Sequence, residues 1–108
     1  MKNLMQSITS LNAQLASQLV RKKWKITTAE SCTGGGIAAT LTDLPGSSQY
    51  FEQGFVTYSN EAKVEMLGVT LPSLEDFGAV SKQVVIEMAT GALNKAHADI
   101  AVSVSGVA

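Results

Sequence analysis

The residues of this chain best suited to chemistry stand together in one segment, Thr28-Ala29-Glu30-Ser31-Cys32-Thr33-Gly34-Gly35-Gly36. Beside its glycines, Ser31, Cys32 and Thr33 offer hydroxyl and thiol groups that can serve as nucleophile or hydrogen-bond donor. The three glycines allow a substrate or a phosphate group to approach the backbone closely. The alternative is a glycine-rich turn without a chemical role, because the segment is neither a Walker motif nor a Gly-x-Ser-x-Gly elbow.

A serine nucleophile needs a base, and the only histidine of the sequence is His97. His97 precedes the last predicted strand, so in a parallel sheet it lies at the amino edge, a strand length away from Ser31. Lys63 is better placed, because it follows the second predicted strand and falls in the first turn of a helix. A desolvated lysine has a lowered pKa and can act as a general base. The alternative for Lys63 is a solvated helix residue.

Other polar residues are expected at the same carboxyl edge of the sheet. Tyr58 ends the second predicted strand and can donate a hydrogen bond to a substrate or stay half-buried in a structural role. Ser105 and Gly106 follow the last strand and can line the same pocket. Glu30 can orient Lys63 or cap backbone amides. Cys32 competes with Ser31 as nucleophile, but a single cysteine without a nearby histidine is more typical of a small core residue.

The elements that must position these residues alternate between helix and strand, which predicts an α/β sheet with mainly parallel strands. Leu4, Ile8, Leu11, Leu15 and Leu19 form one apolar stripe of an amphipathic helix of roughly five turns. The further elements expected are strands over 24–30, 51–59 and 99–107, helices over 36–42, 61–67 and from 82 onward, and a single helical turn over 71–77.

Several caps and turns are predicted from single residues. Asn60 is expected to cap the helix over 61–67, and Gly68 to close it. Ser81 is expected to cap the next helix, whose buried face is Val84, Val85, Met88, Ala92 and Leu93. Gly54 within the second strand indicates a bulge or a close backbone approach.

Composition limits the class of protein. The chain has 108 residues, 45% of them hydrophobic and 16% charged, which is typical of one globular domain. Eight Lys and Arg against nine Asp and Glu leave no basic excess for a nucleic-acid backbone. Cys and His are not spaced as metal ligands, and a single cysteine fits a reducing compartment. Because neither a secretory leader nor a membrane-spanning segment is present, we expect a cytoplasmic protein.

Four blocks of the sequence resemble the CinA C-terminal domain family of nicotinamide-nucleotide amidohydrolases (PncC-like). The first is Thr27 to Gly35, and the others are Pro45-Gly46-Ser47-Ser48, Gly54 to Lys63 and Gly78-Ala79-Val80-Ser81. Ser105-Gly106-Val107-Ala108 is similar to the start of a further glycine-rich loop of the family. The blocks occur in the family's order along essentially the whole chain. The resemblance implies a three-layer α/β/α sandwich with a mostly parallel, mixed sheet.

The resemblance also implies an activity, the hydrolysis of nicotinamide mononucleotide to nicotinate mononucleotide and ammonia in pyridine-nucleotide salvage. Carried over, the family's nucleophile falls on Ser31, its lysine base on Lys63 and its active-site tyrosine on Tyr58. The substrate would be bound by residues of the two glycine-containing loops, with the Gly34-Gly35 backbone contacting substrate or oxyanion: Glu30, Thr33, Gly34, Gly35, Ser105 and Gly106. No metal or organic cofactor is implied.

The end of the chain at Ala108 favours a single domain, 1–108, that is incomplete at its C-terminus, because a strand of a βα unit normally feeds a helix. We therefore expect the chain alone to have little or no deamidase activity. Two alternatives stay open. A non-catalytic nucleotide- or phosphosugar-binding module would bind without releasing ammonia. A fragment that assembles with a partner would expose an apolar sheet edge and self-associate as a homo-oligomer.

Overall fold

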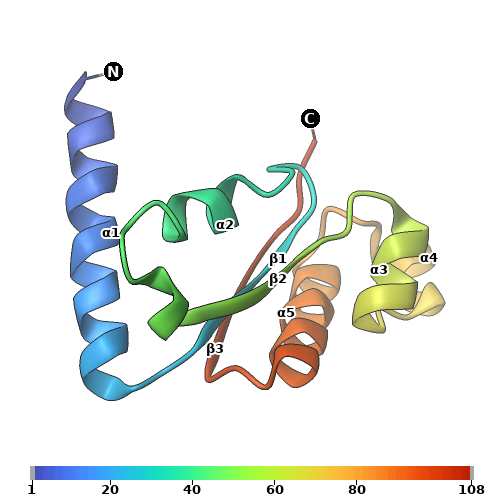
Figure 1. Cartoon of the computed structure of the whole chain (residues 1–108). Helices are drawn as coiled ribbons and strands as arrows, with labels where there is room; N and C mark the ends of the chain where they lie inside the picture. Colours follow the sequence, from blue (N-terminus) through green and yellow to red (C-terminus); the bar gives the residue numbers. More distant parts are fainter. Residues whose placement is uncertain (1, 108) are drawn as a thin grey trace.

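Three parallel strands form the centre of the fold, and helices lie on both faces of the sheet (Figure 1). The computed structural model describes residues 2–107. The elements in chain order are α1 (Lys2–Lys22), β1 (Ile26–Glu30), α2 (Gly36–Leu41), the short 3₁₀ helix η1 (Ser47–Gln49), β2 (Phe51–Val56), α3 (Asn60–Leu67), α4 (Leu71–Phe77), α5 (Lys82–Ala96) and β3 (Ile100–Val104). The three-layer α/β/α architecture predicted from the sequence is confirmed.

The strand order β2-β1-β3 makes β1 the central strand, and all five of its residues are buried. Both neighbours run parallel to it, so within residues 2–107 the sheet contains no antiparallel strand. Glu30, the last residue of β1, pairs with Val56 of β2 and with Val104 of β3. The carboxyl ends of all three strands therefore meet at one edge, which in an open α/β sheet is the edge that binds ligands.

The two faces of the sheet carry separate apolar clusters. On one face, α3 and α5 pack on β1 and β2 through a fully buried set: Ala29, Phe55, Leu67, Val69, Val84, Met88 and Ala92. On the other face, α1 and α2 cover the start of the sheet through Leu19, Ile26, Leu41 and Tyr50. Because α5 contributes Val84, Met88 and Ala92 at intervals of four residues, the helix periodicity read from the sequence does identify its buried side.

Helix α1 forms as predicted, but most of its apolar stripe does not reach the core. Leu19 is 3% exposed, whereas Leu4 and Leu11 are 59% and 63% exposed. Figure 1 shows the N-terminal turns of α1 extending past α2 and away from the sheet. An apolar stripe thus identifies a helix without determining how much of it is covered, since coverage depends on where the helix crosses its neighbours.

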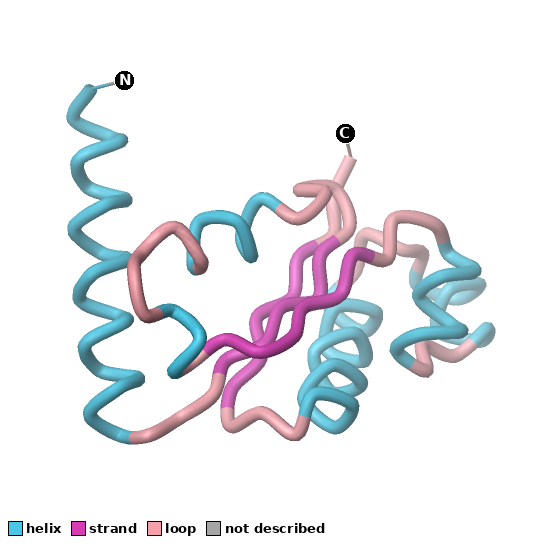
Figure 2. Tube along the Cα trace, in the orientation of Figure 1, coloured by secondary structure: helices cyan, strands magenta, loops and turns pink. Residues whose placement is uncertain are grey.

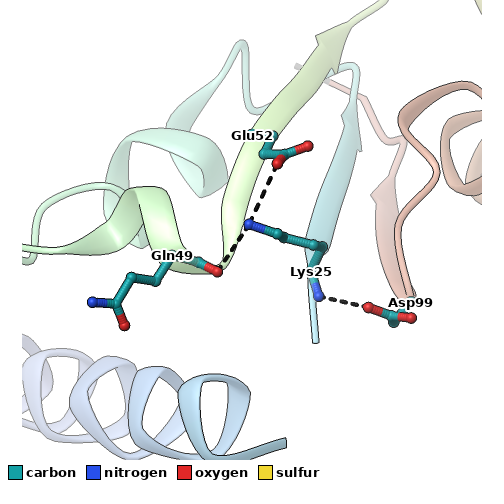
Figure 3. Close-up of polar contacts among 4 residues, drawn as sticks. All are labelled: Lys25, Gln49, Glu52 and Asp99. Atoms are coloured by element: carbon teal, nitrogen blue, oxygen red, sulfur yellow. Dashed lines mark hydrogen bonds and ion pairs between the residues drawn. The ribbon is translucent and has the colours of Figure 1, made fainter. Parts of the chain in front are cut away.

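At the amino edge of the sheet, Lys25, the residue before β1, makes polar contacts with residues near the starts of β2 and β3 (Figure 3). Its Nζ donates to the carbonyl oxygen of Gln49 at 3.0 Å and lies 3.3 Å from the Glu52 carboxylate. Its backbone N–H donates to Asp99 Oδ2 at 2.8 Å. Lys25 therefore connects the beginnings of all three strands at the edge opposite Ser31.

Several boundaries differ from those expected from the sequence. Ser59, and not Asn60, is the N-cap of α3: its hydroxyl accepts from the N–H of Ala62, and Asn60 is already helical. Ser and Asn are both good caps, so the residue type alone did not decide between neighbours. The single turn over 71–77 is the seven-residue helix α4, and the predicted strands over 51–59 and 99–107 end earlier, at Val56 and Val104. The caps predicted at Gly68 and Ser81 are confirmed.

Gly54 lies where the register between β1 and β2 shifts, which confirms the irregularity that the sequence predicted at this glycine. A Cβ at this position would lie 2.6 Å from Thr28 Oγ1 and 2.9 Å from the Phe51 ring. Both contacts are shorter than packed atoms tolerate, so β2 approaches β1 this closely only because residue 54 has no side chain.

None of the helices within residues 2–107 has the length and apolar character needed to cross a membrane.

Gly91 is the contact point between α5 and α3, the helix that carries Lys63. A Cβ at Gly91 would lie 1.9 Å from the carbonyl oxygen of Leu67, a backbone atom that cannot rotate away. We expect Gly91→Ala to lower the free energy of unfolding by about 1–3 kcal/mol, because overpacking forces the two helices apart.

Gly36→Ala is the matched control, because a Cβ at Gly36 meets no atom within 4 Å. It should stay within about 0.5 kcal/mol of the wild type. Urea denaturation midpoints at an unchanged m-value measure both. Equal midpoints for the two variants would contradict the close packing of α3 on α5.

Candidate active site

Ser31 follows β1 directly and is held at the carboxyl edge by both neighbouring strands. Its N–H donates to the carbonyl oxygen of Val104 at 3.1 Å, and the Glu30 carbonyl accepts from the N–H of Thr57 at 2.8 Å. Figure 2 shows the loops after β1 and β3 side by side at this end of the sheet. A Cβ at Gly106 would lie 3.2 Å from Cys32 Sγ, so the two loops are in contact.

Lys63 reaches Ser31 from the first turn of α3. Its Nζ lies 3.0 Å from Ser31 Oγ and donates to the carbonyl oxygen of Tyr58, also at 3.0 Å. Ser31 Oγ is itself 3.3 Å from the Tyr58 carbonyl oxygen. Ser31 and Lys63 are only 6% and 1% exposed. The structure thus brings together the nucleophile and the base expected from the sequence at hydrogen-bond distance.

The environment of Lys63 favours its neutral form. Burial lowers the pKa of its ammonium group below the ordinary value of 10.5, while the neighbouring Cys32 acts in the opposite direction. Among residues 2–107, no carboxylate lies within ion-pair distance of Nζ. A lysine amine that loses its proton readily and touches a serine hydroxyl is able to accept the proton of that hydroxyl.

Tyr58 meets the Ser31–Lys63 pair through its backbone and not through its phenol. The carbonyl oxygen accepts from Lys63, but the side chain is 61% exposed and contacts neither Ser31 nor Lys63 by hydrogen bond. A role for the phenol toward a substrate stays a prediction. The contact between the Tyr58 carbonyl and Lys63 could not be predicted from the sequence, because every residue type carries the same backbone oxygen.

Glu30 does not orient Lys63 and does not face open space. It is fully buried, and its carboxylate accepts from Thr33 Oγ1 at 2.6 Å and from the N–H groups of Ile37 and Ala38 at 2.8 and 2.9 Å. Of the roles expected for Glu30, the contact with backbone amides is present and the orientation of Lys63 is not, while direct contact of this carboxylate with a substrate stays a prediction. Burial raises the pKa of this carboxyl, but the hydrogen bonds, including one from Gly35, outweigh burial and hold the pKa below its ordinary value.

The glycines after Ser31 shape the loop but their amides are already occupied. Gly34 and Gly35 have φ angles of 58° and 102°, which L-residues with a side chain rarely adopt. The N–H of Gly34 donates to the Ser31 carbonyl, and the N–H of Gly35 faces the Glu30 carboxylate, whose pKa it helps to lower. Within residues 2–107, the N–H groups of Cys32 and Thr33 have no hydrogen-bond acceptor. The free donors next to the nucleophile are therefore those of residues 32 and 33.

The remaining sequence predictions concern residues outside this cluster. His97 is the exposed C-cap of α5, with φ 51°, and it precedes β3 at the amino edge of the sheet. Ser31 lies at the opposite edge, so His97 cannot pair with it, as the sequence predicted. Ser105 is half-buried in the loop after β3. Cys32 is half-buried rather than part of the core. No group of three or more metal-ligating side chains occurs in the part of the chain that the structure describes.

Comparison with known proteins places these features in one family. The model of the CinA C-terminal domain matches residues 8–108. The nicotinamide-nucleotide amidohydrolase PncC of Enterobacter agglomerans is 58% identical over 98 residues, which are 91% of this chain and 60% of that protein. The protein of the same name from Escherichia coli K12 is 54% identical, over 94% of this chain and 61% of its own length.

Solved structures agree with the sequence comparison. The competence/damage inducible protein CihA of Agrobacterium tumefaciens superposes with a TM-score of 0.90 and 46% identity, covering 93% of this chain and 61% of the other. A CinA superfamily protein of Escherichia coli has a TM-score of 0.90 and 40% identity, with 92% and 58% covered. The chain thus spans about three-fifths of the length of the relatives it matches, and it belongs to the CinA C-terminal domain family.

Proposed function

We propose that this chain carries the catalytic centre of an amidohydrolase that converts nicotinamide mononucleotide to nicotinate mononucleotide and ammonia, with Ser31 as nucleophile and Lys63 as base. The observation that carries the proposal is the 3.0 Å contact between Ser31 Oγ and a fully buried lysine amine whose pKa is lowered. The name of the two PncC relatives, nicotinamide-nucleotide amidohydrolase, supports a nicotinamide nucleotide as the substrate.

The geometry supports a two-step route through an acyl-enzyme. Ser31 Oγ attacks the carboxamide carbon while its proton passes to Lys63 Nζ, and the carbonyl oxygen becomes an oxyanion. Collapse of this intermediate breaks the C–N bond, and the nitrogen leaves as ammonia after taking the proton from Lys63. Water then attacks the ester carbon, again giving its proton to Lys63. Release of the acid returns that proton to Ser31, so the enzyme is regenerated without a metal or a redox step.

The other predicted site residues have roles around this centre. The backbone amides after Ser31 supply donors for the oxyanion, and such a donor is worth about 10²–10³ in kcat. The Tyr58 phenol and the loop over 105–107 lie at the same edge and are proposed to contact the nucleotide. The Tyr58 carbonyl keeps the Lys63 amine against Ser31.

The test is the release of ammonia from nicotinamide mononucleotide, with the gain of nicotinate mononucleotide measured by mass spectrometry. Two proteins are assayed, the chain itself and a fusion to the part of the Enterobacter agglomerans relative that has no counterpart in this chain. We expect release by the fusion and little or none by the chain alone. Binding of the nucleotide by both proteins without ammonia would instead support a binding module.

A further inference from the structure

Glu30 holds the loop that carries the nucleophile through contacts that span its whole length. The residue directly precedes Ser31, and its Oε1 accepts from Thr33 Oγ1 and the N–H of Ile37. Its Oε2 accepts from the N–H of Ala38. One buried carboxylate therefore joins the end of β1, the middle of the loop over 31–36 and the first turn of α2.

Most backbone amides of the loop already have an acceptor or face one. The N–H groups of Gly34 and Gly36 donate to the carbonyl oxygens of Ser31 and Thr33, and the N–H of Gly35 faces the Glu30 carboxylate, whose pKa it helps to lower. What is left in the described loop is the pair of N–H groups directly after the nucleophile, those of Cys32 and Thr33. Donors at this position are the ones that stabilise an oxyanion formed by attack of the serine.

We propose that Glu30 is a positioning residue for catalysis: it holds the loop in the conformation that leaves the Cys32 and Thr33 amides unpaired beside Ser31. The inference rests on the proposed function for the reaction, but the role it assigns to Glu30 requires no contact with the substrate. Hydrogen bonds to both carboxylate oxygens also compensate the negative charge of Glu30, which would otherwise oppose an oxyanion forming close by.

The chain offers a matched control in Glu87 of α5. Its carboxylate accepts from the N–H of Thr70 at 2.9 Å, from Ser73 Oγ and from Gln83 Nε2 at 2.7 Å. These bonds lower the pKa of Glu87 to about 2, with Ser73 the largest cause. Glu87 thus accepts hydrogen bonds at the start of a helix as Glu30 does, but it is only partly buried and joins α5 to α4, which carries none of the site residues.

The experiment compares Glu30→Gln with Glu87→Gln in the fusion. Glutamine has the same shape, but its NH₂ group faces a backbone N–H where an acceptor is needed. We expect both variants to lose stability, while only Glu30→Gln lowers kcat, by about 10²–10³ as for a lost oxyanion donor, with KM little changed. Glu30→Asp, which keeps the charge on a shorter side chain, should recover part of kcat. Equal kcat values for the two glutamine variants overturn the proposal.

A second readout does not depend on amidase activity. A fluorophosphonate reacts with an activated serine by forming a bond from Oγ to phosphorus and expelling fluoride, while the serine proton passes to the base. Intact mass reports the rate of labelling of Ser31. We expect Glu30→Gln to slow labelling by a factor similar to the loss of kcat, and Glu87→Gln to leave the rate unchanged.

The two readouts separate failure of the inference from failure of the proposed function. A wild-type fusion that labels at Ser31 but releases no ammonia would refute the amidase function, and the ratio of labelling rates would still decide the role of Glu30. Equal labelling rates in both glutamine variants would refute the positioning role. A wild-type protein that neither labels nor releases ammonia refutes both.

Discussion

Replacing Ser31 with alanine is expected to abolish ammonia release from nicotinamide mononucleotide by the fusion. The acyl-enzyme route requires an oxygen nucleophile at this position, and the lysine amine 3.0 Å away has no other hydroxyl to activate among its hydrogen-bond partners. The free energy of unfolding should fall by only about 1–2 kcal/mol, because two side-chain hydrogen bonds of the Ser31 hydroxyl are lost while the Lys63 amine keeps its bond to the Tyr58 carbonyl. Ammonia release and urea denaturation measured on the same preparation check both statements.

Two further variants make this result specific. Cys32→Ala tests the rival nucleophile: its Sγ faces Gly106, and we expect the variant to keep most of the rate. His97→Ala should be nearly silent, because His97 is exposed at the opposite edge of the sheet. Near wild-type turnover in Ser31→Ala, or loss of turnover in Cys32→Ala alone, would show that the wrong side chain has been assigned.

Replacing Lys63 with methionine is expected to lower turnover by about 10²–10⁴-fold, the usual contribution of a general base. Wild-type kcat/KM should rise with pH as the amine loses its proton, with the rise centred below 10.5 because burial lowers the pKa. The residual activity of Lys63→Met should lack this rise. Lys95→Met, at an exposed position near the end of α5, is the control and should keep both rate and profile.

Stability provides an independent check of the same buried amine. Because the pKa of Lys63 is lower in the folded chain, the unfolded chain binds more protons between that pKa and 10.5. The contribution of Lys63 to stability therefore increases as pH rises through this window and is lost as pH falls through the folded-state pKa. Methionine does not titrate, so Lys63→Met lacks this dependence. Relative to the variant, the wild type should therefore gain stability as pH rises through this window toward 10.5. A stability difference between the two proteins that stays constant with pH across the window would contradict the lowered pKa of Lys63.

The positions of Ser31 and Lys63 could be predicted from the sequence because they depend on local patterns. Each follows a predicted strand, and parallel strands bring their carboxyl ends to one edge. The glycines after Ser31 and the caps at Gly68 and Ser81 are equally local, since a residue type and a backbone angle decide them. His97 could be set aside for the same reason, as it precedes a strand rather than following one.

Only the tertiary structure decided how these residues are held. The carbonyl of Tyr58 that supports Lys63, and the amides of Cys32 and Thr33 that stay free, are backbone groups, which no residue type identifies. The direction of the Glu30 carboxylate, toward α2 and not toward Lys63, depends on which donors lie within reach after folding. Exposure of Leu4 and Leu11 likewise depends on where α1 crosses its neighbours. Sequence patterns record local backbone and side-chain preferences, whereas these contacts join groups distant in the chain and exist only once the layers have packed.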